Sequence, residues 1–178
     1  MKIAFAKPGL RATGVVVVSA GAGSKLSASA AKLDKKSGGA LSRAIRASSF
    51  EGKKGHSLNV LALAGTKLDE VMIVGLGKPG DITELEMQRL GGRIYAGTKQ
   101  AKKGSVTVAV DAVTDAKITA ADMATEIAYG AKLRSYRFDK YRTKLKPAEK
   151  PNIKSLTLQC AGFANARKKY ASLGKVAD

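Results

Sequence analysis

Short apolar runs alternate with longer amphipathic stretches along the chain. Six such runs predict β-strands, at about residues 3–5, 15–19, 58–63, 71–75, 106–110 and 153–160. The run from Val15 to Val18 is apolar on both faces, which is typical of a central, covered strand. In residues 106–110 and 156–160, by contrast, apolar side chains alternate with polar or small ones, so these two strands should be covered less completely.

The stretches between these runs carry the 3.6-residue period of helices. Five helices are expected, after Ser24, from Ser37, after Thr83, after Thr119 and over residues 166–173. The third and fourth open with an S/T-x-x-D/E arrangement, whose side chains satisfy free backbone N–H groups of the first turn. Asn165 is expected to cap the fifth helix. Alternating strands and helices predict an α/β domain with a mixed, largely buried sheet of about six strands flanked by helices.

The length of 178 residues suits one domain with one core. Cys160 is the only cysteine, which excludes an internal disulfide, and His56 is the only histidine, which excludes a multi-histidine metal cluster. This favours a reducing, cytoplasmic setting. No apolar stretch reaches the length of a signal-peptide core or of a membrane span, so we expect a soluble protein without a membrane partner.

The net charge of +18 is spread over the whole chain. It indicates an acidic partner, an acidic companion domain or a surface that only confers solubility. Near residues 129–146 basic residues interleave with aromatic rings, an arrangement that can bind a nucleic-acid backbone. The candidate contacts there are Arg137, Lys140, Arg142 and Lys144. The alternative is a solvated helix end whose rings are tucked into the core.

Residues 75–80 spell G-x-G-x-x-G between a predicted strand and a predicted helix, where backbone N–H groups can cradle a pyrophosphate. A dinucleotide site also needs an acidic residue about 20 residues further on. The nearest candidate, Asp111, comes about 30 residues after Gly80, and Pro79 removes one of the donors. We therefore interpret the segment as a tight structural turn and assign no cofactor-binding residue.

The string Gly80-Asp81-Ile82-Thr83 resembles the G-D-I-T of macro domains, in which the Asp contacts the adenine of ADP-ribose. The Asn-rich strand and Gly-rich phosphate loop that follow it in a binding macro domain do not follow Thr83. A helix cap is therefore the preferred interpretation of Asp81 or Thr83. Binding of ADP-ribose or another nucleotide is the alternative.

No catalytic constellation emerges from the pattern of residues. His56 lies in a polar loop, where an ordinary exposed histidine is expected, without the partners of a nucleophilic triad. Two-metal hydrolysis needs several carboxylates converging on ions about 3.5–4 Å apart, whereas the 14 acidic residues of this chain are scattered. We assign no catalytic and no metal-binding residue to the chain.

A distinctive string closes the fourth predicted helix. It resembles G-x-x-L-x-x-Y-x-F-D-x-Y-K-T, a signature near the end of the non-catalytic N-terminal domain of leucyl (cytosol) aminopeptidases. The matching positions are Gly130, Leu133, Tyr136, Phe138, Asp139, Tyr141 and Thr143, with Arg142 for the usual Lys. The V-G-L-G-K string at residues 74–78 is also similar to this family, and the resemblance runs from about Val71 to Lys144.

This resemblance implies that residues 1–178 form a single N-terminal aminopeptidase domain with a macro-like fold, in a fragment from which the catalytic, metal-binding domain is absent. The family's K-G-x-T-F-D-S-G-G and N-T-D-A-E-G-R motifs have no match here. The whole enzyme would be a cytoplasmic homohexamer that removes N-terminal residues from peptides with two Mn or Zn ions. This part would pack against the catalytic domain and other subunits and help to hold or regulate the assembly. Some bacterial members of the family also bind DNA, so DNA is a further partner to test.

Overall fold

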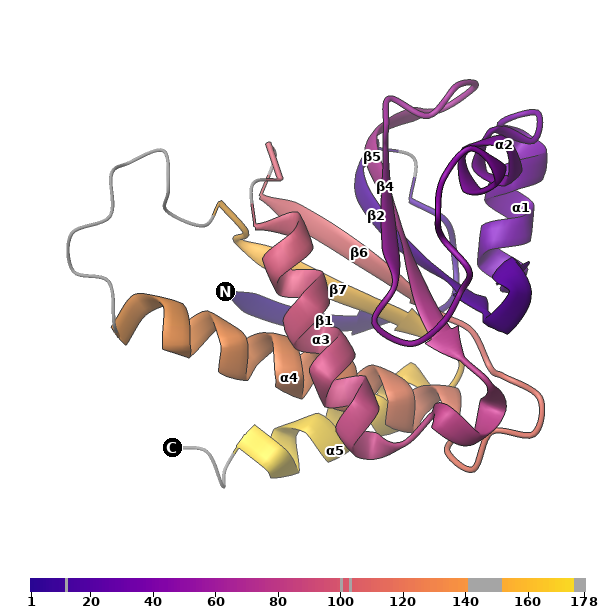
Figure 1. Ribbon diagram of the computed structural model, residues 1–178. Helices are drawn as coiled ribbons and strands as arrows, with labels where there is room; N and C mark the ends of the chain where they lie inside the picture. Colours follow the sequence, from indigo (N-terminus) through magenta and orange to yellow (C-terminus); the bar gives the residue numbers. More distant parts are fainter. Residues whose placement is uncertain (12, 100, 103, 141–151, 175–178) are drawn as a thin grey trace.

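Seven strands form one mixed sheet in a computed structural model that describes residues 1–11, 13–99, 101–102, 104–140 and 152–174, without the side chains of residues 137–140 (Figure 1). The strands are β1 (Lys2–Ala6), β2 (Thr13–Gly21), β3 (Lys25–Leu26), β4 (Ser57–Leu61), β5 (Lys67–Gly77), β6 (Ser105–Val110) and β7 (Ser155–Cys160). They lie in the order β1-β7-β6-β2-β5-β4, and β3 pairs with the end of β2. The pairings are parallel except those of β3 with β2 and of β4 with β5. The predicted mixed α/β sheet flanked by helices is confirmed.

Helices cover both faces of the sheet (Figure 1). One face carries α1 (Ala28–Lys36) and α2 (Ala40–Arg46), and the other carries α3 (Glu84–Thr98), α4 (Ala120–Lys140) and α5 (Phe163–Gly174). Successive side chains of a strand point to opposite faces. Val16 and Val18 of β2 therefore pack under α1 and α2, while Val15 and Val17 pack under the other three helices. This double coverage explains the unbroken apolar run that predicted a central strand.

Helices α3 and α4 pack at backbone contact. A Cβ atom on Gly91 would lie 2.0 Å from the carbonyl oxygen of Ile127, and one on Gly130 would lie 1.9 Å from the carbonyl oxygen of Gln88. At the same crossing, Nε2 of Gln88 donates a hydrogen bond of 2.7 Å to Oε2 of Glu126. The glycine that begins the signature string is therefore required by the packing of two helices.

Two details of the prediction are wrong. Strand β6 is covered on both faces, because Thr107 and Ala109 are only 1% and 6% exposed and the core beneath α1 extends to Ala109. Helix α5 begins at Phe163, so Asn165 is not its N-cap. The N–H of Asn165 instead donates to the carbonyl oxygen of Gly162, and the helix starts three residues earlier than predicted.

Candidate functional site

A crevice lies beyond the ends of two neighbouring parallel strands, β2 and β5. After these two strands the chain continues toward opposite faces of the sheet. After β2 it passes through the 3₁₀ turn η1 (Ala22–Ser24) toward α1, and after β5 it passes through η2 (Pro79–Asp81) toward α3. Such a divergence opens a crevice beyond the carboxyl ends of the two strands, which is where open α/β sheets bind ligands. The glycine turn of residues 75–80 lies at this crevice.

The connection between α2 and β4 enters the crevice and is held there by backbone hydrogen bonds. The carbonyl oxygen of Glu51 accepts from the N–H groups of Gly23 (3.0 Å) and Ser24 (3.2 Å), and that of Gly52 accepts from the N–H of Gly77 (2.9 Å). These N–H groups are the kind that cradle a phosphate when they are free. Here the entering loop already occupies them.

Glycines at the crevice leave no room for side chains. A Cβ atom on Gly75 would lie 2.0 Å from the carbonyl oxygen of Lys53, and one on Gly52 would lie 1.9 Å from that of Gly21. Gly77 adopts a φ of +73°, a region that favours glycine. The close approach of three loops therefore gives these glycines a packing role.

Asp81 and Thr83 cap two consecutive turns. Oδ2 of Asp81 accepts a hydrogen bond of 2.9 Å from the N–H of Lys78, and the hydroxyl of Thr83 accepts one of 3.3 Å from the N–H of Glu86 at the start of α3. The interpretation of the G-D-I-T string as a helix cap is confirmed.

A pocket of about 690 Å³ lies against these loops. Its wall comes from η1, from the loop around Glu51, and from the end of β5 with η2. The wall carries Lys53, Lys54 and Lys78 together with the carboxylates of Glu51 and Asp81. Lys53 pairs with Glu51, and this hydrogen-bonded pair lowers the pKa of the Glu51 carboxyl. The pocket therefore presents charges of both signs.

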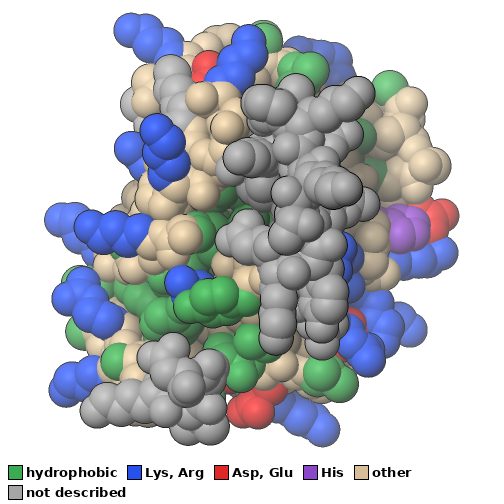
Figure 2. Space-filling model, turned by 90° about the vertical axis from the view of Figure 1, so that its left-hand side faces the viewer, with side chains coloured by type: hydrophobic (Ala, Val, Ile, Leu, Met, Phe, Trp, Pro, Cys, Tyr) green, Lys and Arg blue, Asp and Glu red, His purple; other side chains and the backbone are tan. Residues whose placement is uncertain are grey.

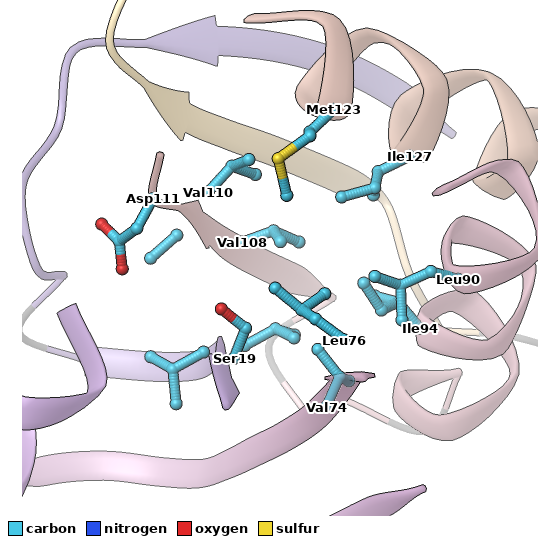
Figure 3. A pocket seen from close by; sticks show the side chains of 13 residues that line it. Ser19, Val74, Leu76, Leu90, Ile94, Val108, Val110, Asp111, Met123 and Ile127 are labelled. Atoms are coloured by element: carbon cyan, nitrogen blue, oxygen red, sulfur yellow. The ribbon is translucent and has the colours of Figure 1, made fainter. Parts of the chain in front are cut away.

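A second, much smaller cavity lies in the core below the strand ends (Figure 3). Its volume of about 10 Å³ is close to the least that a single water needs. The lining is apolar apart from Ser19 and Asp111, and the Asp111 carboxylate is turned away from Leu76 and Ile94. The cavity is too small for a substrate, and we assign no ligand to it.

The sequence raised two residues as candidates for site chemistry, Asp111 and His56. Both side chains accept hydrogen bonds within the fold. The two carboxylate oxygens of Asp111 accept hydrogen bonds from the N–H (2.8 Å) and the hydroxyl (2.7 Å) of Ser29, at the start of α1. Nδ1 of His56 accepts from the N–H of Glu51 at 3.3 Å, and its ring centroid lies 6.3 Å from that of Phe50. These contacts assign Asp111 to the anchoring of α1 and His56 to the shape of the loop in the crevice.

The signature helix α4 ends at a partly apolar surface. Leu133 is 39% exposed and Tyr136 is 53% exposed, so the expectation that the rings of this stretch are tucked into the core does not hold for Tyr136. Nζ of Lys132 lies 4.7 Å from the Tyr136 ring centroid. The pKa of the Tyr170 hydroxyl on α5 is raised, mainly by burial and to a smaller extent by the neighbouring Tyr136. Figure 2 shows hydrophobic side chains gathered between Lys and Arg on the side of the molecule toward which α4 ends. We call Leu133, Tyr136 and Tyr170 the α4-end surface.

The four predicted nucleic-acid contacts fall outside the described side chains. Arg137 and Lys140 belong to α4, but their side chains are not described, and Arg142 and Lys144 lie in the segment 141–151, which the structure does not describe. The same holds for the signature residues after Tyr136. The nucleic-acid contacts stay a prediction.

In the described part of the chain, no group of three or more His, Cys, Asp or Glu side chains is placed to hold a metal ion. These residues therefore do not fit the two-metal centre that the resemblance implies for the whole enzyme. The free thiol of Cys160 is buried, and burial raises its pKa. Across the described segments, no helix combines the length and the apolarity needed to cross a bilayer.

Comparisons with known proteins agree on one family. The family model described as "Cytosol aminopeptidase family, N-terminal domain" matches residues 15–145 of the chain. Over its whole length the chain is 34% identical to a probable cytosol aminopeptidase of Rhodopseudomonas palustris, of which it covers 35%. Over 151 residues, or 83% of the chain, it is 37% identical to a probable cytosol aminopeptidase of a Bradyrhizobium species, of which it covers 30%.

Solved structures show the same fold at lower sequence identity. A mutant of tomato leucine aminopeptidase has a TM-score of 0.71 at 23% identity, covering 96% of this chain and 35% of that one. The bottromycin maturation enzyme BotP, in complex with Mn, has a TM-score of 0.59 at 20% identity, covering 89% of this chain and 28% of that one. At these identities the likeness concerns the fold alone.

The fold is thus one that occurs as part of larger aminopeptidase chains. The chain belongs to the cytosol aminopeptidase family, and it matches the N-terminal domain of that family. It spans about a third of the length of the curated relatives that it matches.

Proposed function

We propose that this chain acts as the non-catalytic N-terminal domain of a bacterial-type leucyl aminopeptidase and packs against a catalytic domain through the α4-end surface. The observation that carries this proposal is the exposure of Leu133 and Tyr136, two large side chains of the signature string. Contiguous exposed apolar surface marks interaction sites, and Leu133 and Tyr136 lie one helical turn apart on α4, with Tyr170 near Tyr136. Because each is roughly half exposed, burying both would contribute on the order of 1 kcal/mol per residue.

By this proposal, residues 1–178 are one domain and the catalytic residues lie outside this chain. The whole enzyme releases N-terminal amino acids from peptides with two Mn or Zn ions, as a cytoplasmic homohexamer. Family membership and the share of about a third of each relative support this division of labour. In the assembly, this domain would hold or regulate the catalytic domain and its neighbours.

The net charge of +18 supports a further, weak property. A surface of this charge attracts the phosphate backbone of DNA without reading its sequence. DNA is therefore proposed as an additional partner that does not depend on the α4-end surface.

The gene that encodes this chain gives the simplest test. An in-frame K-G-x-T-F-D-S-G-G motif downstream of codon 178 is the expected result, and a stop codon directly after Asp178 would contradict the proposal.

Docking is tested in the parent enzyme. The double variant Leu133→Ser/Tyr136→Ser should loosen the domain, measured as faster proteolytic release and as loss of the assembled species in light scattering. The matched control is Leu61→Ser/Leu85→Ser, which changes side chains that are 72% and 56% exposed on β4 and at the start of α3. Equal behaviour of the two double variants would contradict docking through the α4-end surface.

A further inference from the structure

The pocket at the strand ends carries charges that the fold uses only in part. Lys53 is paired with Glu51, and Asp81 uses Oδ2 to accept from the backbone of Lys78. Within the described residues, the ammonium groups of Lys54 and Lys78 make no hydrogen bond or ion pair. Two cationic groups and the second carboxylate oxygen of Asp81 therefore remain available at the pocket wall.

The backbone around the pocket does not suit a phosphate. Phosphate cradles at glycine-rich turns depend on free N–H groups. The N–H groups of Gly23, Ser24 and Gly77 all donate to carbonyl oxygens of the loop that enters the crevice, and the N–H of Lys78 donates to Asp81. A ligand that carries a positive group as well as negative ones would pair with Asp81 and with the two lysines in the wall.

We propose that the pocket binds a short acidic peptide, a ligand with one ammonium group and at least two carboxylates. Asp81 would accept from the ammonium group, while Lys54 and Lys78 would pair with the carboxylates. The volume of about 690 Å³ lies within the range of about 300–1,000 Å³ that is usual for small-molecule sites, so a di- or tripeptide has room. Exposed charge pairs contribute about 1 kcal/mol or less each, so three of them give an expected dissociation constant of about 1–10 mM.

Peptides with free amino ends are the substrates of an aminopeptidase, so the pocket would let this domain sense what the enzyme acts on. The sensing role rests on the proposed function, whereas the binding of the peptide to the pocket does not. The experiment therefore uses the 178-residue chain alone. If the chain binds the peptide but the gene lacks a catalytic domain, only the proposed function fails; if it does not bind, only the pocket proposal fails.

The test is calorimetric titration of the chain with leucyl-aspartate at low ionic strength. Expected are one site per chain and amide NMR shifts confined to residues 22–24, 50–54 and 77–81. N-acetyl-leucyl-aspartate, which lacks the ammonium group, and leucinamide, which lacks carboxylates, should each bind at least about fivefold more weakly. ADP serves as the phosphate probe and should bind no more tightly than leucyl-aspartate. Tighter binding of ADP, shifts outside these loops, or no binding at about 10 mM peptide would overturn the proposal.

Two pairs of lysine variants distinguish a dedicated binding site from a general effect of the net charge. Lys54→Ala/Lys78→Ala should weaken leucyl-aspartate binding at least about tenfold. Lys32→Ala/Lys35→Ala, on α1 and outside the pocket wall, removes the same charge and should change the affinity less than about twofold. Asp81→Asn keeps the hydrogen-bond acceptor but should abolish the preference over the acetylated peptide. Equal losses in the two lysine pairs would show that no dedicated site exists, and circular dichroism of each variant confirms that it is folded.

Discussion

Replacing Gly130 by alanine should destabilise the domain, because α3 and α4 touch there through their backbones. The new Cβ atom would lie 1.9 Å from the carbonyl oxygen of Gln88 and 2.7 Å from its Cα. An ordinary contact between a carbon atom and a carbonyl oxygen is about 3.3–3.6 Å long, so the helices would have to separate by about 1.5 Å. No side-chain rotation can supply that space, since the atoms that Gly130 meets belong to the backbone.

The net effect follows from two opposing contributions. Overpacking of a close contact costs about 1–3 kcal/mol and occasionally more. The better helix propensity of alanine returns up to about 1 kcal/mol. Because the clash is with backbone atoms, the overpacking cost lies at the upper end of its range, and after the helix-propensity gain Gly130→Ala should lose about 2 kcal/mol of unfolding free energy. For a domain of this size, that loss lowers the Tm by about 2–4 °C per kcal/mol.

Gly92→Ala is the matched control, on α3 at the same helix pair. Its Cβ atom would meet only the Cβ of Arg134, at 3.9 Å, so alanine fits and should stabilise α3 by about 0.5–1 kcal/mol. Urea unfolding followed by circular dichroism measures both free energies. The reasoning is refuted if Gly130→Ala is as stable as the unchanged protein, or if both variants shift stability in the same direction.

Three further predictions follow from single features. Hydrogen bonds from Lys169 and Thr119 lower the pKa of the Asp122 carboxyl, so its stabilising effect is present above its ordinary pKa of 3.8 and is lost as the pH falls below that value. The loss of unfolding free energy in Asp122→Asn should therefore be larger in urea titrations at pH 7 than at about pH 2; a loss that does not change with pH would contradict this. Burial of the Cys160 thiol should make it react with a thiol reagent far faster in urea than in buffer, and equal rates would contradict its burial. Duplex DNA should bind weakly, with several-hundredfold loss between 50 and 200 mM salt if about five phosphates are contacted. Charge-neutral replacement of the candidate contacts should weaken it more than replacement of a control set, and equal losses would show that no dedicated patch exists. The two sets are Arg137, Lys140, Arg142 and Lys144, and Lys32, Lys35, Lys53 and Lys54.

Most of the sheet was predictable because burial leaves a local pattern of apolar residues, as in the run from Val15 to Val18. Strand β3 was not, because it consists of two residues whose pairing with Ala20 and Gly21 depends on β2 and not on any local period. The full coverage of β6 was missed for a related reason. The alternation of Thr107 and Ala109 with valines predicts a half-exposed strand. Only the tertiary packing shows that both faces of β6 are covered.

The site was predictable only in part. Pro79 and the position of Asp111 were enough to interpret the glycine turn as structural. The pocket was not predictable, because Glu51 and Lys54 come more than twenty residues before Lys78 and meet it only through the entry of their loop into the crevice. The exposure of Tyr136 was equally hidden, since an aromatic residue at a helix end is compatible with a core or a docking role.

The non-catalytic role of this chain is tested most directly by an aminopeptidase assay. The 178-residue chain is incubated with a leucyl chromogenic substrate and added Mn or Zn, with a buffer blank and a chelator control. Because the described residues bring no three potential metal ligands together, the rate should equal the blank. Hydrolysis above the blank that the chelator abolishes would contradict the assignment of catalysis to a separate domain.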